Sequence, residues 1–184
     1  MKEALLVHIC CAPDSIWSFQ VLMEEYEPVG YFFNPNIFPL NEYVKRLKET
    51  EKASSILNFK LIEGERDYFK WFGLTKELAS EPEMGKRCDI CYEIRLRRTA
   101  EKALELGIKN FTTVMSNSPW KKVKTLNNIG KLIGDEFKIN FLEKDFKKKD
   151  GFKKSVELCK IYQIYRQNYC GCIYSLRDRL LKDR

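Results

Sequence analysis

The stretch that decides the fold reads Leu5-Leu6-Val7-His8-Ile9-Cys10-Cys11-Ala12-Pro13-Asp14-Ser15. Its first half is a short apolar run, which is typical of a strand buried in a parallel sheet. The run stops at the two cysteines, after which Asp14 and Ser15 offer N-cap chemistry for a helix with an apolar face that begins at Ile16. The sequence therefore predicts a strand, a short loop with two cysteines and a helix in direct succession.

Strands and helices alternate along the rest of the chain in the same way. Further strands are expected at residues 29–33, 59–62, 111–114 and 137–142. Helices are expected at about 40–57, within 67–83, at about 88–106 with Gly107 beyond its end, before Gly134, up to Tyr162 and near the C-terminus. This alternation predicts a single α/β domain over residues 1–184, with a mainly parallel, Rossmann-like sheet flanked by helices. Because sites in such sheets lie beyond the carboxyl ends of strands, the Cys10-Cys11 loop is well placed for chemistry.

Composition narrows the class of protein further. Hydrophobic residues make up 44% of the 184 residues, which is enough for one core, so the 32% of charged residues does not indicate disorder. No apolar run approaches the roughly 18–20 residues of a membrane helix. The N-terminal apolar stretch is also too short for a signal peptide, which predicts a cytoplasmic protein with no membrane partner. The net charge of +7 favours a polyanionic partner such as nucleic acid.

The chain contains seven cysteines, and their spacing is more informative than their number. An odd number without a secretion signal argues against a disulfide scaffold. Cys159 stands apart on an expected helix and is interpreted as a core residue. The other six form three close groups, namely Cys10-Cys11, Cys88-x-x-Cys91 and Cys170-x-Cys172. This grouping indicates metal binding or redox chemistry.

Two of these groups are suited to hold a metal together. Cys88 and Cys91 are spaced i, i+3, so in the first turn of a helix both thiols share a face, and the helix N-terminus favours the thiolate form. Cys10 and Cys11 can bind at one site only if the strand has already ended, as Pro13 indicates. Four thiolates suit either zinc or an iron–sulfur cluster. The additional cysteine pair, which is capable of redox chemistry, favours iron–sulfur slightly.

Several residues allow two interpretations each. Gly171 lets the backbone turn tightly between Cys170 and Cys172, which suits either two metal ligands or a reversible, strained disulfide. Asp14 is a helix N-cap by pattern, but it follows the cysteine pair and could reach a metal. His8, the only histidine, is either a hydrogen-bonded residue at the end of a buried strand or a supporting residue or proton donor at the site.

The motifs and their order resemble the QueH family of epoxyqueuosine reductases. Residues 6–13 are similar to the HxCCxP start of these proteins, and residues 31–37 are similar to their YNPNI segment. Residues 87–96, 145–151 and 165–172 are similar to RCxxCYxxRL, DFKKKDG and YRQxYCGC. The resemblance is specific because five motifs follow in order over most of the chain.

The resemblance implies cobalamin-independent reduction of epoxyqueuosine to queuosine at the wobble position of tRNA, the final step of queuosine biosynthesis, with an external electron donor. It also implies that Cys170 and Cys172 are a redox pair. Many members read CCxPC, whereas residue 14 here is Asp, and an oxygen ligand at Asp14 would suit an additional mononuclear iron and a catalytic role. The residues that would hold a [4Fe–4S] cluster by this resemblance are Cys10, Cys11, Cys88 and Cys91.

A tRNA partner gives two further features an interpretation. Trp120, beside Lys121 and Lys122, is either a base-stacking residue or a core residue. A run of lysines is often only a solvated face, but here it is expected to contact the phosphate backbone. The lysines of this basic stretch are Lys147, Lys148, Lys149, Lys153 and Lys154.

Three other functions fit parts of the pattern. A zinc-stabilised RNA-binding protein would use the same thiolates without catalysis, and a disulfide reductase would use the cysteine pairs without tRNA. A nucleotide-using enzyme similar to tRNA thiolases would place a phosphate-binding loop after the first strand. The Cys-Cys-Ala-Pro sequence lacks the glycines and serine with which such a loop cradles phosphate, which argues against this third function.

Overall fold

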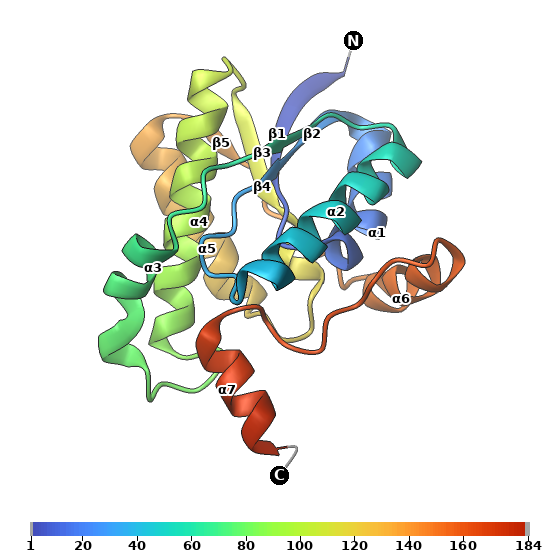
Figure 1. Ribbon diagram of the computed structural model, residues 1–184. Coiled ribbons are helices and arrows are strands. Elements are labelled where there is room, and N and C mark those ends of the chain that lie inside the picture. Colours follow the sequence, from blue (N-terminus) through green and yellow to red (C-terminus); the bar gives the residue numbers. More distant parts are fainter. Residues whose placement is uncertain (1, 183–184) are drawn as a thin grey trace.

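The chain is arranged around one five-stranded sheet, as the computed structural model in Figure 1 shows for residues 2–182. Every strand pair is parallel, and the strand order is β3-β2-β1-β4-β5. The strands are β1 (Glu3–His8), β2 (Tyr26–Phe32), β3 (Leu61–Glu63), β4 (Asn110–Thr113) and β5 (Asn140–Phe141). The predicted α/β fold with a parallel sheet is confirmed.

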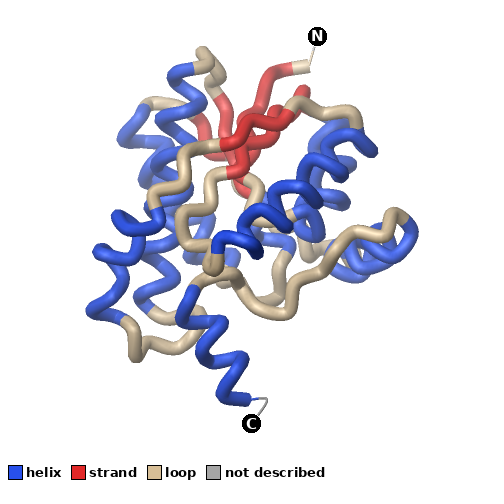
Figure 2. Tube along the Cα trace, in the orientation of Figure 1, coloured by secondary structure: helices blue, strands red, loops and turns tan. Residues whose placement is uncertain are grey.

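Helices flank the sheet on both sides (Figures 1 and 2). Helix α1 packs against α2 and α6, whereas α4 packs against α5 and α3. The helices are α1 (Ala12–Glu25), α2 (Leu40–Leu57), α3 (Tyr68–Thr75), α4 (Lys86–Glu105), α5 (Val123–Phe137), α6 (Gly151–Ile161) and α7 (Ile173–Lys182), with 3-10 turns η1 (Lys76–Leu78) and η2 (Val114–Asn117). Among residues 2–182, no helix is long and apolar enough to cross a membrane.

The centre of the core is β1, as the apolar run at the start of the chain predicts. Leu5, Leu6, Val7 and Ile9 are fully buried, because β1 is the middle strand and has helices on both sides. Full burial of each such side chain contributes about 2 kcal/mol. The loop with Cys10 and Cys11 therefore begins from the most firmly held strand of the sheet.

Helix α1 begins earlier than the sequence pattern predicts. Its N-cap is Cys11, and Pro13, Asp14 and Ser15 lie inside the first turn rather than before it. Proline is compatible with this position, because the backbone N–H groups of a first turn have no partner within the helix. The prediction that Asp14 and Ser15 cap the helix was therefore wrong. The Asp14 carboxylate is instead presented beside the cysteine pair.

Two predicted strands differ from the observed ones at their ends. Helix α5 extends to Phe137, and Lys138 adopts a left-handed conformation with φ of 56° that ends the helix, so only Asn140 and Phe141 of the predicted strand 137–142 pair with β4. Strand β4 ends at Thr113, because Val114 already belongs to the turn η2. Both differences lie at element ends, where local backbone conformation outweighs apolar pattern.

The direction of the chain across the sheet reverses at β1. The chain continues from β1 to β2 and β3 on one side, whereas β4 and β5 lie on the other side. In open parallel sheets, such a reversal leaves a crevice beyond the carboxyl ends of the strands. The loop after β1 carries Cys10 and Cys11, and η2 follows β4 directly. The position that the sequence predicted for the site is therefore a switch point of the sheet.

Candidate active site

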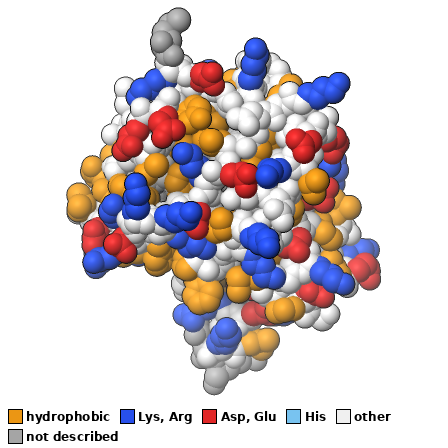
Figure 3. All heavy atoms as spheres, turned by 180° about the vertical axis from the view of Figure 1, so that it is seen from behind, with side chains coloured by type: hydrophobic (Ala, Val, Ile, Leu, Met, Phe, Trp, Pro, Cys, Tyr) orange, Lys and Arg blue, Asp and Glu red, His pale blue; other side chains and the backbone are white. Residues whose placement is uncertain are grey.

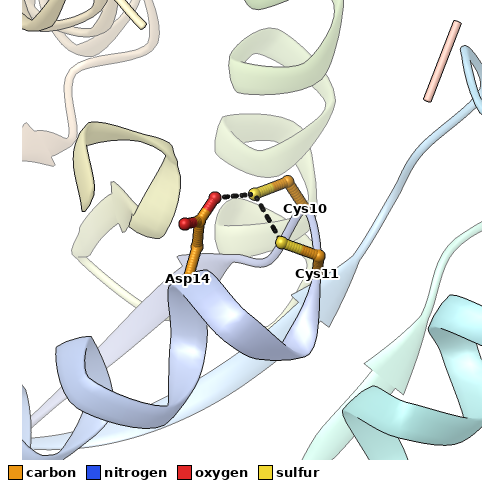
Figure 4. Close-up of side chains that lie close together, drawn as sticks. All are labelled: Cys10, Cys11 and Asp14. Atoms are coloured by element: carbon orange, nitrogen blue, oxygen red, sulfur yellow. Dashed lines mark hydrogen bonds between the residues drawn. The ribbon is translucent and has the colours of Figure 1, made fainter. Parts of the chain in front are cut away.

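Cys10, Cys11 and Asp14 form a group of three potential ligands (Figure 4). Because β1 ends at His8 and α1 begins at Ala12, the two adjacent thiols do not alternate across a strand. The Sγ atoms of Cys10 and Cys11 are 3.7 Å apart, and the Cys10 thiol donates to Oδ2 of Asp14 over 3.1 Å. The three ligand atoms all lie within 4.8 Å of one another.

Burial disfavours the charged forms of Cys10 and Asp14 when no cation is present. The hydrogen bond with Cys11, followed by burial, raises the pKa of the Cys10 thiol well above its usual value. Burial also raises the pKa of the Asp14 carboxyl group, although hydrogen bonds from the two cysteines oppose this shift. A bound cation would favour the charged form of both groups. The arrangement is therefore chemically suited to a cation.

Cys88 and Cys91 lie at the start of α4 but outside the three-ligand group. The Cys88 thiol accepts a hydrogen bond from the backbone N–H of Met84 over 3.3 Å, and Cys91 packs with Trp71 and Cys172. Burial raises the pKa of Cys88 to about 11, so the helix N-terminus alone does not make it a thiolate. The Cys88 thiol can therefore bind a cation only if the cation itself stabilises the thiolate.

The Cys170-Gly171-Cys172 segment is held by a buried arginine from α2. Arg46 donates to the carbonyl oxygens of Cys170 and Tyr169 over 2.9 and 3.1 Å. Gly171 has φ of 122°, and a Cβ atom there would lie 2.8 Å from Nη1 of Arg46. Both the backbone conformation and the close approach therefore require glycine. All seven cysteines of the chain are free thiols in this structure.

Lys121 is a site residue that the sequence did not single out. Its Nζ atom lies 3.0 Å from Sγ of Cys170 and 3.4 Å from the carboxylate of Glu83. Only 8% of the lysine is exposed. In the sequence, Lys121 was interpreted only as a charge beside Trp120, a candidate base-stacking residue. Its contact with a cysteine 49 positions away could not be found from that pattern.

The surroundings of Cys170 and Cys172 shift the pKa values of the two thiols in opposite directions. A hydrogen bond from Cys172 holds the pKa of the Cys170 thiol well below its usual value, and the Lys121 ammonium group acts in the same direction. The same hydrogen bond and burial raise the pKa of Cys172. Although burial disfavours its charge, the Cys170 thiolate raises the pKa of Lys121 well above its usual value. These surroundings favour the thiolate form of Cys170 and the thiol form of Cys172.

His8 and Arg95 form a buried polar network behind the cysteines. His8 contacts Oγ1 of Thr113 over 3.0 Å and the carbonyl oxygen of Phe33 over 3.1 Å. Arg95 donates to Nε2 of His8 over 3.3 Å and to Oδ1 of Asn34 over 2.7 Å. Burial lowers the pKa of His8 well below its usual value, so the ring is neutral. His8 is thus a hydrogen-bonded residue at the end of a buried strand, and its role as a supporting residue or proton donor stays a prediction.

A cavity of about 610 Å³ connects several of these groups. Cys10, Cys11 and Asp14 line it together with Cys170 and Lys121, whereas Cys88, Cys91 and Cys172 do not. Its volume lies within the range of roughly 300–1,000 Å³ that is usual for small-molecule sites. The cavity therefore brings the group after β1 and the group before α7 to one space, although about 160 residues separate them in the sequence.

The basic stretch leads into α6, which contributes Phe152 and Ser155 to the cavity wall. Lys148, Lys149 and Lys153 are exposed, whereas Lys147 and Lys154 are half-buried. Lys147 donates to the carbonyl oxygen of Lys121 over 3.4 Å. On the face shown in Figure 3, basic and acidic side chains are interspersed, so the positive charge is not gathered in one field there. The basic stretch thus borders the cavity without lining it.

The fold and the site define a class of protein: a parallel α/β protein with a thiol-rich cavity at the switch point of its sheet, equipped for metal or redox chemistry. The sequence family described as epoxyqueuosine reductase QueH matches residues 5–178. The chain belongs to this family, and its activity class is that of an oxidoreductase. The family and the enzyme class predicted from the five motifs are confirmed.

Relatives of the same description occur in several bacteria. The epoxyqueuosine reductase QueH of Streptococcus pyogenes serotype M1 is 37% identical, over 96% of this chain and 72% of its own length. The QueH protein of Thermotoga maritima is also 37% identical, over 95% of this chain and 91% of its own length. The QueH protein of Acinetobacter baylyi is 35% identical, over 96% of this chain and 82% of its own length.

The fold also occurs among solved structures. One of these is described as a predicted subunit of tRNA methyltransferase from Methanocaldococcus jannaschii, and it superposes with a TM-score of 0.55. The likeness covers 83% of this chain and 76% of that chain, at 15% identity. At this identity the likeness supports the α/β architecture alone.

Proposed function

We propose that the protein reduces epoxyqueuosine to queuosine at the wobble position of tRNA, in the cytoplasm and as the final step of queuosine biosynthesis. The observation that carries this proposal is the cavity in which Cys170 and the Cys10, Cys11 and Asp14 group line the same space. Membership in the QueH family supports it independently. A buried thiol pair and a potential metal group around one cavity suit a reductase.

Cys170 and Cys172 can supply the two electrons that reduction of the epoxide requires. Removal of the epoxide oxygen as water, with formation of a carbon–carbon double bond, takes up two electrons and two protons. Oxidation of the Cys170 thiolate and the Cys172 thiol to one disulfide releases two electrons and one proton, and the ammonium group of Lys121, 3.0 Å from Sγ of Cys170, supplies the second proton. An external electron donor then reduces the disulfide again. Cys170 faces the cavity, and Cys172, which does not line it, hydrogen-bonds to Cys170.

Lys121 has two roles in this proposal. Its ammonium group, 3.0 Å from Sγ of Cys170, keeps that thiol ionised. Because Lys121 also lines the cavity, Nζ holds a proton beside the place where the epoxide oxygen leaves. Glu83, 3.4 Å away, orients the ammonium group from its other side. The lysine thus links the redox thiol with the supply of protons.

The residues present fit a metal cofactor. Ligands about 2.3 Å from one ion lie at most about 4.6 Å apart, and the ligand atoms of Cys10, Cys11 and Asp14 come close to this limit with a span within 4.8 Å. Cysteines that bind different irons of a cluster need no such closeness, so Cys88 and Cys91 can take part with Cys10 and Cys11. When bound, a [4Fe–4S] cluster would supply single electrons and a mononuclear iron at Asp14 would supply Lewis acidity.

Arg95 supports a cofactor of negative charge at this place. Its side chain is 2% exposed, and no carboxylate among residues 2–182 forms an ion pair with it. Its Nη1 atom lies 4.0 Å from Sγ of Cys91 instead. A buried cation without a partner costs several kcal/mol. Cysteine thiolates around an iron–sulfur cluster would compensate this charge.

Metal analysis tests the cofactor. Protein purified without oxygen is expected to contain about four iron and four sulfide ions per chain, with a broad brown absorption band. Iron in excess of sulfide is expected from the additional ion, and Asp14→Ala should remove only that excess. One zinc ion without sulfide, persisting after attempted cluster reconstitution, would support a zinc-stabilised RNA-binding protein instead.

A further inference from the structure

The mouth of the cavity carries aromatic side chains that the proposed reaction does not use. Trp120 lines the cavity and is 66% exposed, and Phe152 lines it and is 36% exposed. The core interpretation of Trp120 that the sequence allowed was therefore wrong. An exposed tryptophan side chain forgoes the stabilisation that burial would give it. A ligand with a flat apolar face that stacks on the ring would bury it and gain this free energy.

The substrate must enter the cavity as a single base. The reacting group belongs to a nucleotide, and Cys10 and Cys11 at the inner wall are buried. Enzymes that act on bases take the nucleotide out of its stack, and this costs least in single-stranded segments such as an anticodon loop. A cavity of about 610 Å³ holds one modified nucleoside rather than a helix. The base that passes the mouth therefore passes Trp120.

The other groups at the mouth complement a nucleotide. Gln167 lines the cavity, and its Oε1 atom is buried and accepts no hydrogen bond from the residues that the structure describes. A guanine-type base offers N–H donors to such an acceptor. Lys147 holds the basic stretch against the backbone of Lys121, the neighbour of Trp120. The mouth of the cavity thus combines three features that suit a nucleotide. The basic stretch offers positive charge for phosphate, Trp120 offers an aromatic face, and Gln167 offers a hydrogen-bond acceptor without a partner.

We propose that Trp120 is the stacking platform on which the wobble base of tRNA rests as it enters the cavity, with Gln167 as the acceptor for its base edge. This inference rests on the proposed function, because it takes the wobble base as the substrate. Stacking on an aromatic side chain tolerates every base, whereas an amide acceptor selects among them. Trp120 would therefore supply affinity, and Gln167 would supply preference for a guanine-type base.

The test is binding and turnover of an anticodon stem–loop RNA that carries epoxyqueuosine. Trp120→Ala is expected to raise Kd by about tenfold, the effect of losing one stacked base, and Trp120→Phe should restore most of the affinity. The matched control is Phe69→Ala, because Phe69 is an aromatic residue with 85% exposure that does not line the cavity. Its Kd should equal that of the wild type.

Tryptophan fluorescence gives a second readout that does not depend on turnover. Wild-type fluorescence should be quenched when the RNA binds, and Trp120→Phe should abolish the quenching while keeping the affinity. Unchanged Kd and unchanged quenching in the two Trp120 variants would overturn the stacking inference even if the protein reduces the RNA. Quenching and weakened binding as expected, in a protein that never reduces the base, would instead overturn the proposed function and leave the stacking platform in place.

Discussion

Replacement of Cys170 by serine is expected to lower the turnover of epoxyqueuosine tRNA by at least about a thousandfold, as the loss of an essential reacting thiol does. The hydroxyl group cannot form the disulfide that releases two electrons. Cys170 also lies outside the proposed ligand set, so iron and sulfide content should stay at the wild-type level. The measurement is single-turnover reduction under anaerobic conditions, with metal analysis of the same sample.

Cys159→Ser is the matched control for this experiment. Cys159 is a buried cysteine like Cys172, but it packs with Ala12 and Ile16 in a separate apolar cluster and does not line the cavity. Its substitution should leave turnover within a few-fold of the wild type. Full activity of Cys170→Ser would exclude the redox pair. Loss of iron in Cys170→Ser would show that this thiol is a metal ligand instead.

Arg95→Met is expected to destabilise the iron-loaded protein by about 3–5 kcal/mol, the scale for removing one partner of a buried charge pair. The substitution removes the donors to Asn34 and His8 and leaves the negative charge of the cluster uncompensated. Urea unfolding without oxygen, followed by absorption of the cluster and by circular dichroism, measures the change. Metal-free protein should lose much less, because the arginine then has no anionic partner.

Arg97→Met makes the same substitution on the same helix and provides the control. Arg97 is partly exposed and pairs with Glu136 and Glu93 at the surface. Exposed ion pairs contribute about 0–1 kcal/mol, so this variant should change stability by no more than that. Equal stability of iron-loaded Arg95→Met and wild-type protein would show that Arg95 does not compensate a cluster.

The architecture could be predicted from the sequence because its signals are local. The apolar run in β1, the prolines and glycines at the turns and the helical periodicities each act within a few residues. The errors lie where local signals compete. Asp14 and Ser15 suggested an N-cap, yet a first turn accepts Pro13, so α1 begins at Ala12.

The site could be predicted only in part, for a related reason. The cysteine groups are visible as close pairs, and Cys10, Cys11 and Asp14 form one group because they share one loop and one helix turn. Lys121 and Arg46 contact the Cys170 segment from distant parts of the chain. These contacts depend on how α2 and the loop before α5 pack beside the Cys170 segment. The spacing of residues in the sequence does not predict that packing.

The most direct test of the proposed function is turnover by the iron-loaded protein. Epoxyqueuosine tRNA would be incubated with the protein and a low-potential reductant without oxygen, and the tRNA nucleosides would be separated and weighed by mass spectrometry. We predict that the epoxyqueuosine nucleoside is replaced by queuosine, which has one oxygen atom fewer. Epoxyqueuosine that remains unchanged, in a sample with full iron and sulfide content and demonstrated tRNA binding, would contradict it.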